Sequence, residues 1–502
     1  MNLGLYDLLA KAANQFPDKQ ALITNARALS YHQLLCDVDS AAECLNQLGL
    51  MKNEPIGIAY HNSIEFVTLL FACAKLKIPA VLLGVYLKQS ELMYYIKNIG
   101  IGKVIASNDM DSVMRGAGRR IELLEKTSFN FWSFPENCKA QFNDGDLYCQ
   151  LTSGTNGMSK ASIRTEEAII NEIKNTIEIM QFTHNDSFIT LTPIHHSYGL
   201  IAGTLAPLTL GAQLYLAVNF VPADIIHEID TRQSTVMLAV PYMYHLFSQT
   251  IRNRNVKLPA EHLLSLRYCI SAGASMHETV ESEFYDVFGK KITQDYGSTE
   301  TGVMCINKNL IQYKSSVGVP VGDSQIKAFN DAGEALPENK TGELRIKSKS
   351  TARAYIYPVE LNQDAFHDGW FSTGDLGYVN STGCVFVVSR KTNIINVAGM
   401  KVDPIEVENI IMKIPGVVEA AVVGVDMGPS GQAVKAYIVS ERKIDDMDIV
   451  LFCKENISHF KIPKYIEFVD KLPKSQTGKV IRKYLIGSDH ENSVDTKVNF
   501  TG

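Results

Sequence analysis

The first 110 residues of the chain alternate between two spacings of apolar positions. Apolar side chains that recur every three or four residues predict helices over 5–16, 64–76 and 90–99. Short continuous apolar runs, typical of buried strands, occupy 56–60, 79–83 and 103–106. This alternation predicts a largely parallel sheet covered by helices, and we interpret the less regular stretch from about 107 to 145 as a connection between lobes.

A second α/β lobe is predicted beyond residue 160. Its strand-like runs are 188–192, 235–240 and 266–270. Its helix-like segments are 223–229, 242–250 and 276–288. From 316 to 388 the helical spacing disappears, and short runs such as 342–346 are separated by Gly, Asp and Pro, which predicts a β-rich lobe.

The pattern changes once more beyond Arg390. Here helix-like segments at 403–412 and 446–457 alternate with strand-like runs at 417–425, 433–439 and 465–469. The chain is therefore predicted to be an α/β protein in two parts. The large N-terminal domain, 1–389, contains two α/β lobes and a β-rich lobe, and the small α+β C-terminal domain spans 390–502, with a polar end from Gly487 that we expect to be loose.

Composition narrows the class of protein. At 502 residues the chain is too long for one hydrophobic core. A net charge of −6 argues against a nucleic-acid binder. The apolar region 65–87 is interrupted by Lys75, Lys77 and Pro79, so no membrane span is expected. No cationic N-terminus followed by an apolar core is present, so no secretory signal is expected. Nine cysteines without a C-x-x-C pair are typical of reduced thiols in a cytoplasmic protein.

One loop, LTSGTNGMSK at 151–160, carries the first candidate chemistry. We expect it to join a buried strand at 146–151 to a helix that starts at Thr165. Glycines let backbone N–H groups approach an anion, hydroxyls can donate, and Lys160 adds a positive charge, as a polyphosphate site requires. The Walker A pattern is not met, because Lys160 stands between Ser159 and Ala161. Alone, the loop also fits an ordinary turn.

Five further islands follow at wide spacing: PIHHSYG (193–199), SAGA (271–274), QDYGSTET (294–301), FSTGDL (371–376) and LPKSQTGK (472–479). Taken singly, Asp375 could cap a turn, Glu300 could begin an exposed helix, and Lys479 could be a turn lysine. In this order, and together with the loop and the run 389–408, the islands resemble the adenylate-forming superfamily of acyl-CoA synthetases, adenylation domains and luciferases. The resemblance extends from Leu29 to Arg482.

This resemblance implies a two-step reaction that uses ATP and Mg²⁺. A small carboxylic acid attacks the α-phosphorus of ATP, pyrophosphate leaves, and a thiol then takes the acyl group from the acyl-adenylate. Charge develops on phosphoryl oxygens, so the site needs cations and donors placed in advance. The residues that would hold the β- and γ-phosphates are Thr152, Ser153, Gly154, Thr155, Asn156, Gly157 and Lys160.

The same resemblance gives roles to residues further along the chain. Glu300 would ligate Mg²⁺, Thr299 would donate to the α-phosphate, and Lys479 would bridge the substrate carboxylate and the α-phosphate. Asp375 would accept both ribose hydroxyls, with Arg390 on the ribose side. The remaining nucleotide-binding positions are Gly273, Ala274, Tyr296, Gly297 and Ser298.

In this superfamily the C-terminal domain is mobile and rotates between the two half-reactions. The implied pivot is Thr392, and Gly399 would leave room for a thin thiol arm. His196 would act as a gate where the acyl chain meets the thiol, whereas His195 is interpreted as structural. The chain departs from the superfamily pattern at Asn156, Ser159, Ser389, Thr392 and Asn396, which puts the speed of domain rotation in doubt.

The implied acyl pocket is mostly small or apolar, with segments 196–200, 240–243, 271–273 and 297–304 and Tyr215. The island 193–199 lacks the aspartate that amino-acid-activating domains use, which disfavours an α-amino acid and leaves a fatty, branched or aryl acid. The acceptor is either CoA, as in an acyl-CoA ligase, or a phosphopantetheinylated carrier protein loaded in trans. Two other hypotheses are a non-catalytic nucleotide-binding homologue and an unrelated phosphate-loop NTPase that would release ADP. Luciferase-like oxidation has no positive support.

Overall fold

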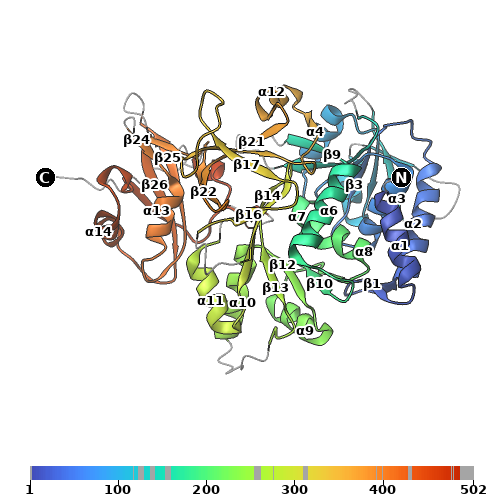
Figure 1. Cartoon of the computed structure of the whole chain (residues 1–502), viewed down its shortest axis with the longest axis horizontal. Coiled ribbons are helices and arrows are strands. Elements are labelled where there is room, and N and C mark those ends of the chain that lie inside the picture. The colour runs from blue at the N-terminus through green and yellow to red at the C-terminus, as the bar shows by residue number, and fades with distance from the viewer. Residues whose placement is uncertain are drawn as a thin grey trace.

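The computed structural model of the chain describes its residues with several gaps. Described are 3–116, 118–121, 129–135, 142–152, 160–253, 262–274, 276–308, 315–391, 393–397, 400–427, 432–475, 478 and 480–486. Figure 1 shows a broad N-terminal region and a smaller C-terminal unit at the opposite end of the long axis.

In the described part of the chain, the first sheet has eight strands in the order β19-β9-β8-β4-β3-β5-β7-β6. Its central strands are parallel, as predicted, and the outer ones are antiparallel. The strands are β3 (Ile56–Ala59), β4 (Ala80–Leu82), β5 (Lys103–Ala106), β6 (Arg119–Ile121), β7 (Asn130–Ser133), β8 (Asp146–Thr152), β9 (Lys160–Thr165) and β19 (Ala354–Tyr357).

The second sheet has nine described strands in the order β16-β15-β14-β13-β12-β10-β11-β1-β2. Strands β10 to β14 along this path run parallel. The strands are β1 (Gln20–Ile23), β2 (Ala28–Ser30), β10 (Ser187–Thr190), β11 (Gln213–Leu216), β12 (Val236–Ala239), β13 (Tyr268–Ser271), β14 (Ile292–Ser298), β15 (Gly302–Asn307) and β16 (Val319–Pro320).

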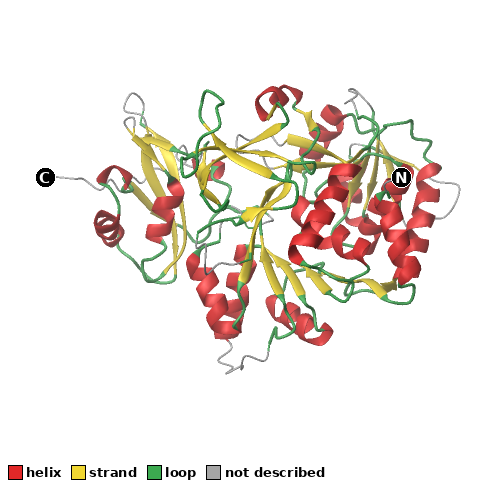
Figure 2. Cartoon of the chain, in the orientation of Figure 1, coloured by secondary structure: helices red, strands yellow, loops and turns green. Residues whose placement is uncertain are grey.

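Helices lie between the two sheets and on their outer faces, and Figure 2 shows this layering. One apolar cluster combines residues of both sheets with the helices between them. These are α1 (Leu5–Gln15), α2 (Tyr31–Asn46), α3 (Ile64–Leu76), α6 (Glu166–Met180), α7 (Ser197–Leu200) and α8 (Ala206–Leu210), with a π-helical turn at Ile201–Leu205. The outer layers are α4 (Gln89–Ile99) on the first sheet and α9 (Pro222–Arg232), α10 (Pro241–Asn253) and α11 (Glu278–Phe288) on the second.

The helix α3 shows why sequence alone located this layer well. Its residues from Phe66 to Ala74 are buried on every side, and Ser63 caps its first turn by accepting a hydrogen bond from the N–H of Phe66. A helix that is apolar all round is stable only inside a core, and α3 meets that condition because sheets lie on both sides of it.

A third sheet forms the predicted β-rich lobe. Its described strands are β17 (Gln325–Phe329), β18 (Gly342–Lys347), β20 (Phe366–His367), β21 (Trp370–Val379) and β22 (Val385–Arg390), with the short helix α12 (Asn362–Ala365) beside them. The C-terminal unit follows, with β23 (Ile395–Val397) and β24 (Met400–Val402) as a ribbon. Its main sheet is β25 (Val417–Asp426), β26 (Gln432–Ser440) and β27 (Tyr465–Phe468), with helices α13 (Pro404–Ile411), α14 (Asp446–Asn456) and α15 (Lys483–Ile486).

The structure corrects three local predictions. The segment 107–145 does not connect lobes, because it supplies α5 (Asp111–Arg115), β6 and β7, which extend the first sheet. The loop 151–160 does not join a strand to a helix, since Thr152 pairs with Lys160 across the antiparallel strands β8 and β9. The segment therefore connects two paired strands, and α6 begins only after β9. The two α/β lobes are also not consecutive in sequence, because β1 and β2 join the second sheet and β19 joins the first.

Candidate active site

The predicted islands meet at one edge of the second sheet. The parallel strands β10, β13 and β14 end next to or within the islands 193–199, 271–274 and 294–301. Carboxyl ends of parallel strands share one edge of a sheet, and in α/β proteins ligands bind outside that edge. The topology therefore brings these three islands together.

The first cluster centres on the Asp375 carboxylate of β21. The Tyr296 hydroxyl donates to Oδ2 of Asp375 at 2.6 Å, and Nε of Arg390 lies 2.6 Å from Oδ1. Burial, with the charge of Asp375 beside it, raises the pKa of Tyr296 well above its ordinary value, so the phenol stays protonated and donates. A carboxylate offers about four acceptor positions, so about two remain for further donors.

The second cluster links both sheets through Tyr355 on β19. The Tyr355 hydroxyl donates to Oε1 of Glu300 at 2.8 Å, and Nζ of Lys160 approaches the same hydroxyl at 3.3 Å. Burial and the charge of Glu300 raise the pKa of Tyr355, so this hydroxyl also stays protonated. One tyrosine thus joins the lysine that closes the phosphate loop to the carboxylate predicted to ligate Mg²⁺.

The turn between these clusters requires glycine. A side chain at Gly297 would place its Cβ 2.4 Å from the carbonyl oxygen of Gly302, because a bulge in the β14–β15 pairing brings the two backbones together. The Ser298 N–H donates to the Thr301 hydroxyl at 3.2 Å, which closes the turn. Within the described residues, the Thr299 hydroxyl has no hydrogen-bond partner, so it is available to a ligand.

His196 precedes α7, and its ring centroid lies 4.2 Å from that of His195. Burial lowers the pKa of His196 to about 4, so the ring is neutral at physiological pH. A neutral ring with this pKa is suited to a gate and is a poor proton acceptor. The His195 carbonyl accepts a hydrogen bond from Nε2 of Gln150 at 3.0 Å, which ties the island 193–199 to β8 of the other sheet.

Sequence reasoning missed two residues that position the site. Asn62 donates to the Thr192 and Ala217 carbonyls at 3.0 Å and accepts from the Ile194 N–H at 2.9 Å, so it fixes the start of the island 193–199. From the sequence, Asn62 is recognisable only as a residue that precedes the predicted helix 64–76. Tyr355 was missed as well, and the apolar run 354–357 would have predicted its strand but not its contact with Glu300.

Tyr215, which the resemblance assigned to the acyl pocket, is buried beneath α9. Its hydroxyl donates to Asn25, and Arg232 stacks on its ring at 4.8 Å. The side chain belongs to the apolar cluster under α9.

The C-terminal unit reaches the site through the island 472–479. A Cβ at Gly478 would lie 3.3 Å from Cβ of Tyr242 and 3.8 Å from Val240, so this loop lies against the segment that follows β12. Lys474 lies over the Tyr242 ring at 4.0 Å and pairs with Glu419 at 2.7 Å.

Several predicted residues lie outside the described part of the chain. They are Ser153, Gly154, Thr155, Asn156, Gly157, Ser159, Thr392, Gly399 and Lys479. Thr152 and Lys160 flank the loop, Gly273 and Ala274 are exposed after β13, and Arg390 is the last residue of β22. Since Arg390 still pairs with Asp375, the third sheet includes one residue more than the predicted boundary at 389.

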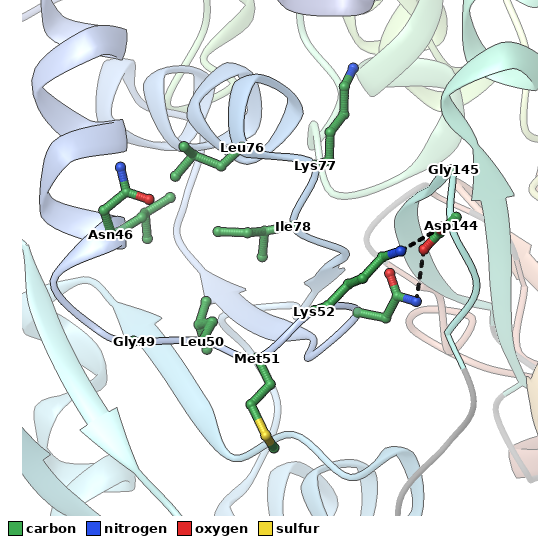
Figure 3. A pocket seen from close by; sticks show the side chains of 12 residues that line it. Asn46, Gly49, Leu50, Met51, Lys52, Leu76, Lys77, Ile78, Asp144 and Gly145 are labelled. Carbon is green, nitrogen blue, oxygen red and sulfur yellow. Dashed lines mark hydrogen bonds and ion pairs between the residues drawn. The ribbon is translucent and has the colours of Figure 1, made fainter.

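A separate pocket of about 540 Å³ lies at the other end of β8, before Asp146 (Figure 3). There Lys52 and Asn53 bond to Asp144 at 2.7 and 3.1 Å. Among the described residues, no group of three or more His, Cys, Asp or Glu could hold a metal ion. No helix in the described ranges has the length and hydrophobicity of a bilayer span.

Two family models match the chain, one in its N-terminal region and one in its C-terminal unit. The model of the AMP-binding enzyme matches residues 9–356, and the model of its C-terminal domain matches 406–479. The chain belongs to the AMP-binding enzyme family. The predicted membership of the adenylate-forming superfamily is thereby confirmed, and so is the predicted α/β fold with a separate C-terminal domain.

Similar proteins support the same assignment over nearly the full length. The chain is 26% identical to an oxalate–CoA ligase of Arabidopsis thaliana, over 95% of this chain and 97% of the relative. It is 26% identical to a 2-succinylbenzoate–CoA ligase of Bacillus licheniformis, over 95% and 98%. Among solved structures, ATP-bound MatB from Rhodopseudomonas palustris has a TM-score of 0.83 at 23% identity, over 96% of this chain and 98% of that one.

Proposed function

We propose that this member of the AMP-binding enzyme family is an ATP- and Mg²⁺-dependent acyl-CoA ligase that activates a carboxylic acid as an acyl-adenylate. The observation that carries the proposal is the convergence of Asp375, Tyr296, Glu300 and Lys160 from three sheets on one sheet edge, faced by the Gly478 loop. The curated relatives named above are CoA ligases, in agreement with the predicted AMP-forming acid–thiol ligase.

The ribose end of the nucleotide would bind at Asp375. The carboxylate is fixed by the Tyr296 hydroxyl and Arg390, which leaves its free lone pairs to accept from a vicinal diol. Because Tyr296 stays protonated, its hydroxyl keeps donating throughout the working pH range. Gly273 and Ala274 are exposed after β13, and we propose that they contact the adenine base together with Tyr296.

The phosphate end would lie between the loop 151–160 and Glu300. Lys160 supplies a cation at the end of this loop, and the Thr299 hydroxyl, unpartnered among the described groups, can donate to a phosphoryl oxygen. Glu300 has one carboxylate oxygen held by Tyr355, and a carboxylate oxygen is the ligand type that Mg²⁺ prefers. The bound ion would neutralise phosphate charge. Lys479, next to Gly478, would complete the site from the C-terminal side.

The acid would enter near His196, and the thiol would reach it along a separate path. A neutral His196 can move without desolvating a charge, which suits a gate. We propose Gly399 for the thiol path and Thr392 for the pivot, on the resemblance alone.

ATP–pyrophosphate exchange over a panel of fatty, branched, dicarboxylic and aryl acids tests the proposal. Exchange that depends on one class of acid, followed by thioester formation with CoA, is the expected result. Carboxylate-independent release of ADP, or no exchange with any acid, would overturn it and favour the NTPase or the non-catalytic homologue. CoA and a phosphopantetheinylated carrier protein should be offered to the same acyl-adenylate, because loading of a carrier in trans is the second candidate.

A further inference from the structure

Strand β14 carries a carboxyl group that the proposed chemistry does not use. Asp295 lies on β14, next to Tyr296. Successive side chains of a strand point to opposite faces, so Asp295 points away from the Tyr296–Asp375 cluster. Thr293 and Asp295 share the face that lies toward α6 and α7, because Ile306, which pairs with Asp295, belongs to the cluster between the two sheets.

Tyr198 of α7 covers the same face of the sheet. Its hydroxyl donates to the Ile270 carbonyl on β13 at 2.8 Å, and Ile270 pairs with Thr293 on β14. The side chain that follows Thr293 on that face is Asp295, whose charge is one cause, after burial, of the raised pKa of Tyr198. Tyr198 belongs to the island 193–199 that carries His196, so Asp295 lies on the side of the sheet where the acid is proposed to enter.

The Asp295 carboxyl lacks a partner among the described residues. It has no hydrogen bond or ion pair there, although the residue is only partly exposed. The cation beside Glu172 is Arg164, and its guanidinium binds the Glu172 carboxylate and donates to the Ser350 carbonyl at 2.6 Å. Burial, with the charge of Glu172, raises the pKa of Asp295 well above its ordinary value. A largely buried carboxyl without a hydrogen-bond partner is stabilised by any hydrogen-bond donor that a ligand brings.

We propose that Asp295 selects acids that carry an N–H or O–H donor distant from the reacting carboxylate, by accepting a hydrogen bond from that donor. The proposal rests on the acyl-CoA ligase function above and names its class of acid. Asp295 lies on β14 before the bulge at Gly297 and faces away from the Tyr296–Asp375 cluster, whereas Thr299, proposed to contact the α-phosphate, lies in the turn beyond the bulge. The donor therefore belongs on the far end of the acid, as in an ω-hydroxy or ω-amino chain or a para-substituted aryl acid.

Matched acids in pyrophosphate exchange test this assignment. The panel is hexanoate, 6-hydroxyhexanoate and 6-aminohexanoate, with 3-phenylpropanoate and its para-hydroxy and para-amino forms. The wild-type enzyme should favour at least one donor-bearing acid over its parent by about 100-fold in kcat/KM, since a site built for a donor rejects the analogue that lacks it. The change should appear in KM for the acid, with KM for ATP unaltered.

Two variants separate selection from structure. Asp295→Leu keeps a similar volume and should remove the preference, lowering kcat/KM for the donor-bearing acid by about 10- to 100-fold without lowering it for the parent. Asp295→Asn keeps a hydrogen-bond acceptor and an almost identical shape, so this variant should retain activity with hydroxy acids. Activity with an acid that carries a cationic amino group should be lost in Asp295→Asn, because the negative charge is removed. This variant therefore distinguishes hydroxyl donors from ammonium donors.

Two results would overturn the proposal. One is a wild-type preference for the parent acids, and the other is an equal loss for all acids in Asp295→Leu, which would make Asp295 structural. Exchange with apolar acids alone would refute the role of Asp295 and leave the ligase function standing. Absence of exchange with every acid would instead refute the ligase function and the proposal together.

Discussion

Removing the Tyr296 hydroxyl isolates one contact of the proposed ribose site. Tyr296→Phe keeps the ring and deletes the hydrogen bond of 2.6 Å to Asp375, which then keeps only Arg390. A hydrogen bond to a charged group stabilises a protein by about 1.5–3 kcal/mol. The bond exists before the nucleotide binds, so most of this loss falls on the free enzyme and not on nucleotide affinity.

In Tyr296→Phe the Asp375 carboxylate is less restrained, so nucleotide binding must immobilise it, and this costs free energy of binding. Immobilising one side chain costs about 0.5–1.5 kcal/mol, which predicts a rise of about 2- to 10-fold in KM for ATP with kcat little changed. ATP-dependent pyrophosphate exchange at saturating acid measures this rise. Tyr378→Phe is the matched control, because Tyr378 lies on β21, the strand of Asp375, stacks on Phe386, and its hydroxyl has no partner within the described residues. Equal KM values for the two variants would show that Asp375 does not hold the nucleotide.

Three further predictions concern the C-terminal loop and His196. Lys479→Ala should abolish pyrophosphate exchange yet largely spare thioester formation from supplied acyl-adenylate, and equal loss in both assays would contradict two alternating domain positions. Gly478→Ala should slow exchange by about 5- to 30-fold, because a left-handed residue (φ 74°) costs about 1–2 kcal/mol in Ala. The control Gly383→Ala has the same backbone cost (φ 79°) but no neighbour within 4 Å, so it should leave exchange unchanged. The folded pKa of His196, about 4, lies below its ordinary 6.5, so the unfolded chain binds more protons between these values and stability should fall as pH drops through that window. Thermal unfolding of His196→Phe from pH 7 to 4 should show a weaker dependence than wild type.

The sequence predicted the helices and strands whose apolar residues recur at a clear spacing. It did not predict the elements whose position depends on pairing with distant strands. The helix α3 and the strand β5 occur at the predicted residues, because burial on all sides leaves continuous apolar runs. The strand β9 was taken for part of a loop and helix start. Its polar residues Ser162 and Arg164 are buried by pairing with β8 and β19 and by the ion pair with Glu172. Such partners lie far away in sequence, so local spacing gives no sign of them.

The candidate site was predictable as a set of motifs but not as a set of contacts. The island 294–301 gave Tyr296 and Glu300 as site residues, yet nothing in the sequence indicates that the Tyr296 hydroxyl binds Asp375 or that Tyr355 joins Lys160 to Glu300. Asp295 lies within the same island, and no role was assigned to it from the sequence. Its importance depends on which face of β14 it occupies, which follows from strand pairing and from the position of Tyr198.

The arrangement of apolar clusters bears on the predicted rotation of the C-terminal domain. Of the clusters formed by described residues, those before Arg390 end at Val387 and the others begin at Ile395, so none combines the two sides. Among the described residues, the contacts that cross include Gly478 against Tyr242, Lys474 over the same ring, and the Ser389 hydroxyl, which donates to Oδ1 of Asp403 at 2.8 Å. Separating such a surface exposes little apolar area, whereas dividing a shared core would cost about 25 cal/mol for each Å². The energetics therefore favour movement about the segment between Arg390 and Ile395, even though the residue expected at the pivot departs from the superfamily pattern.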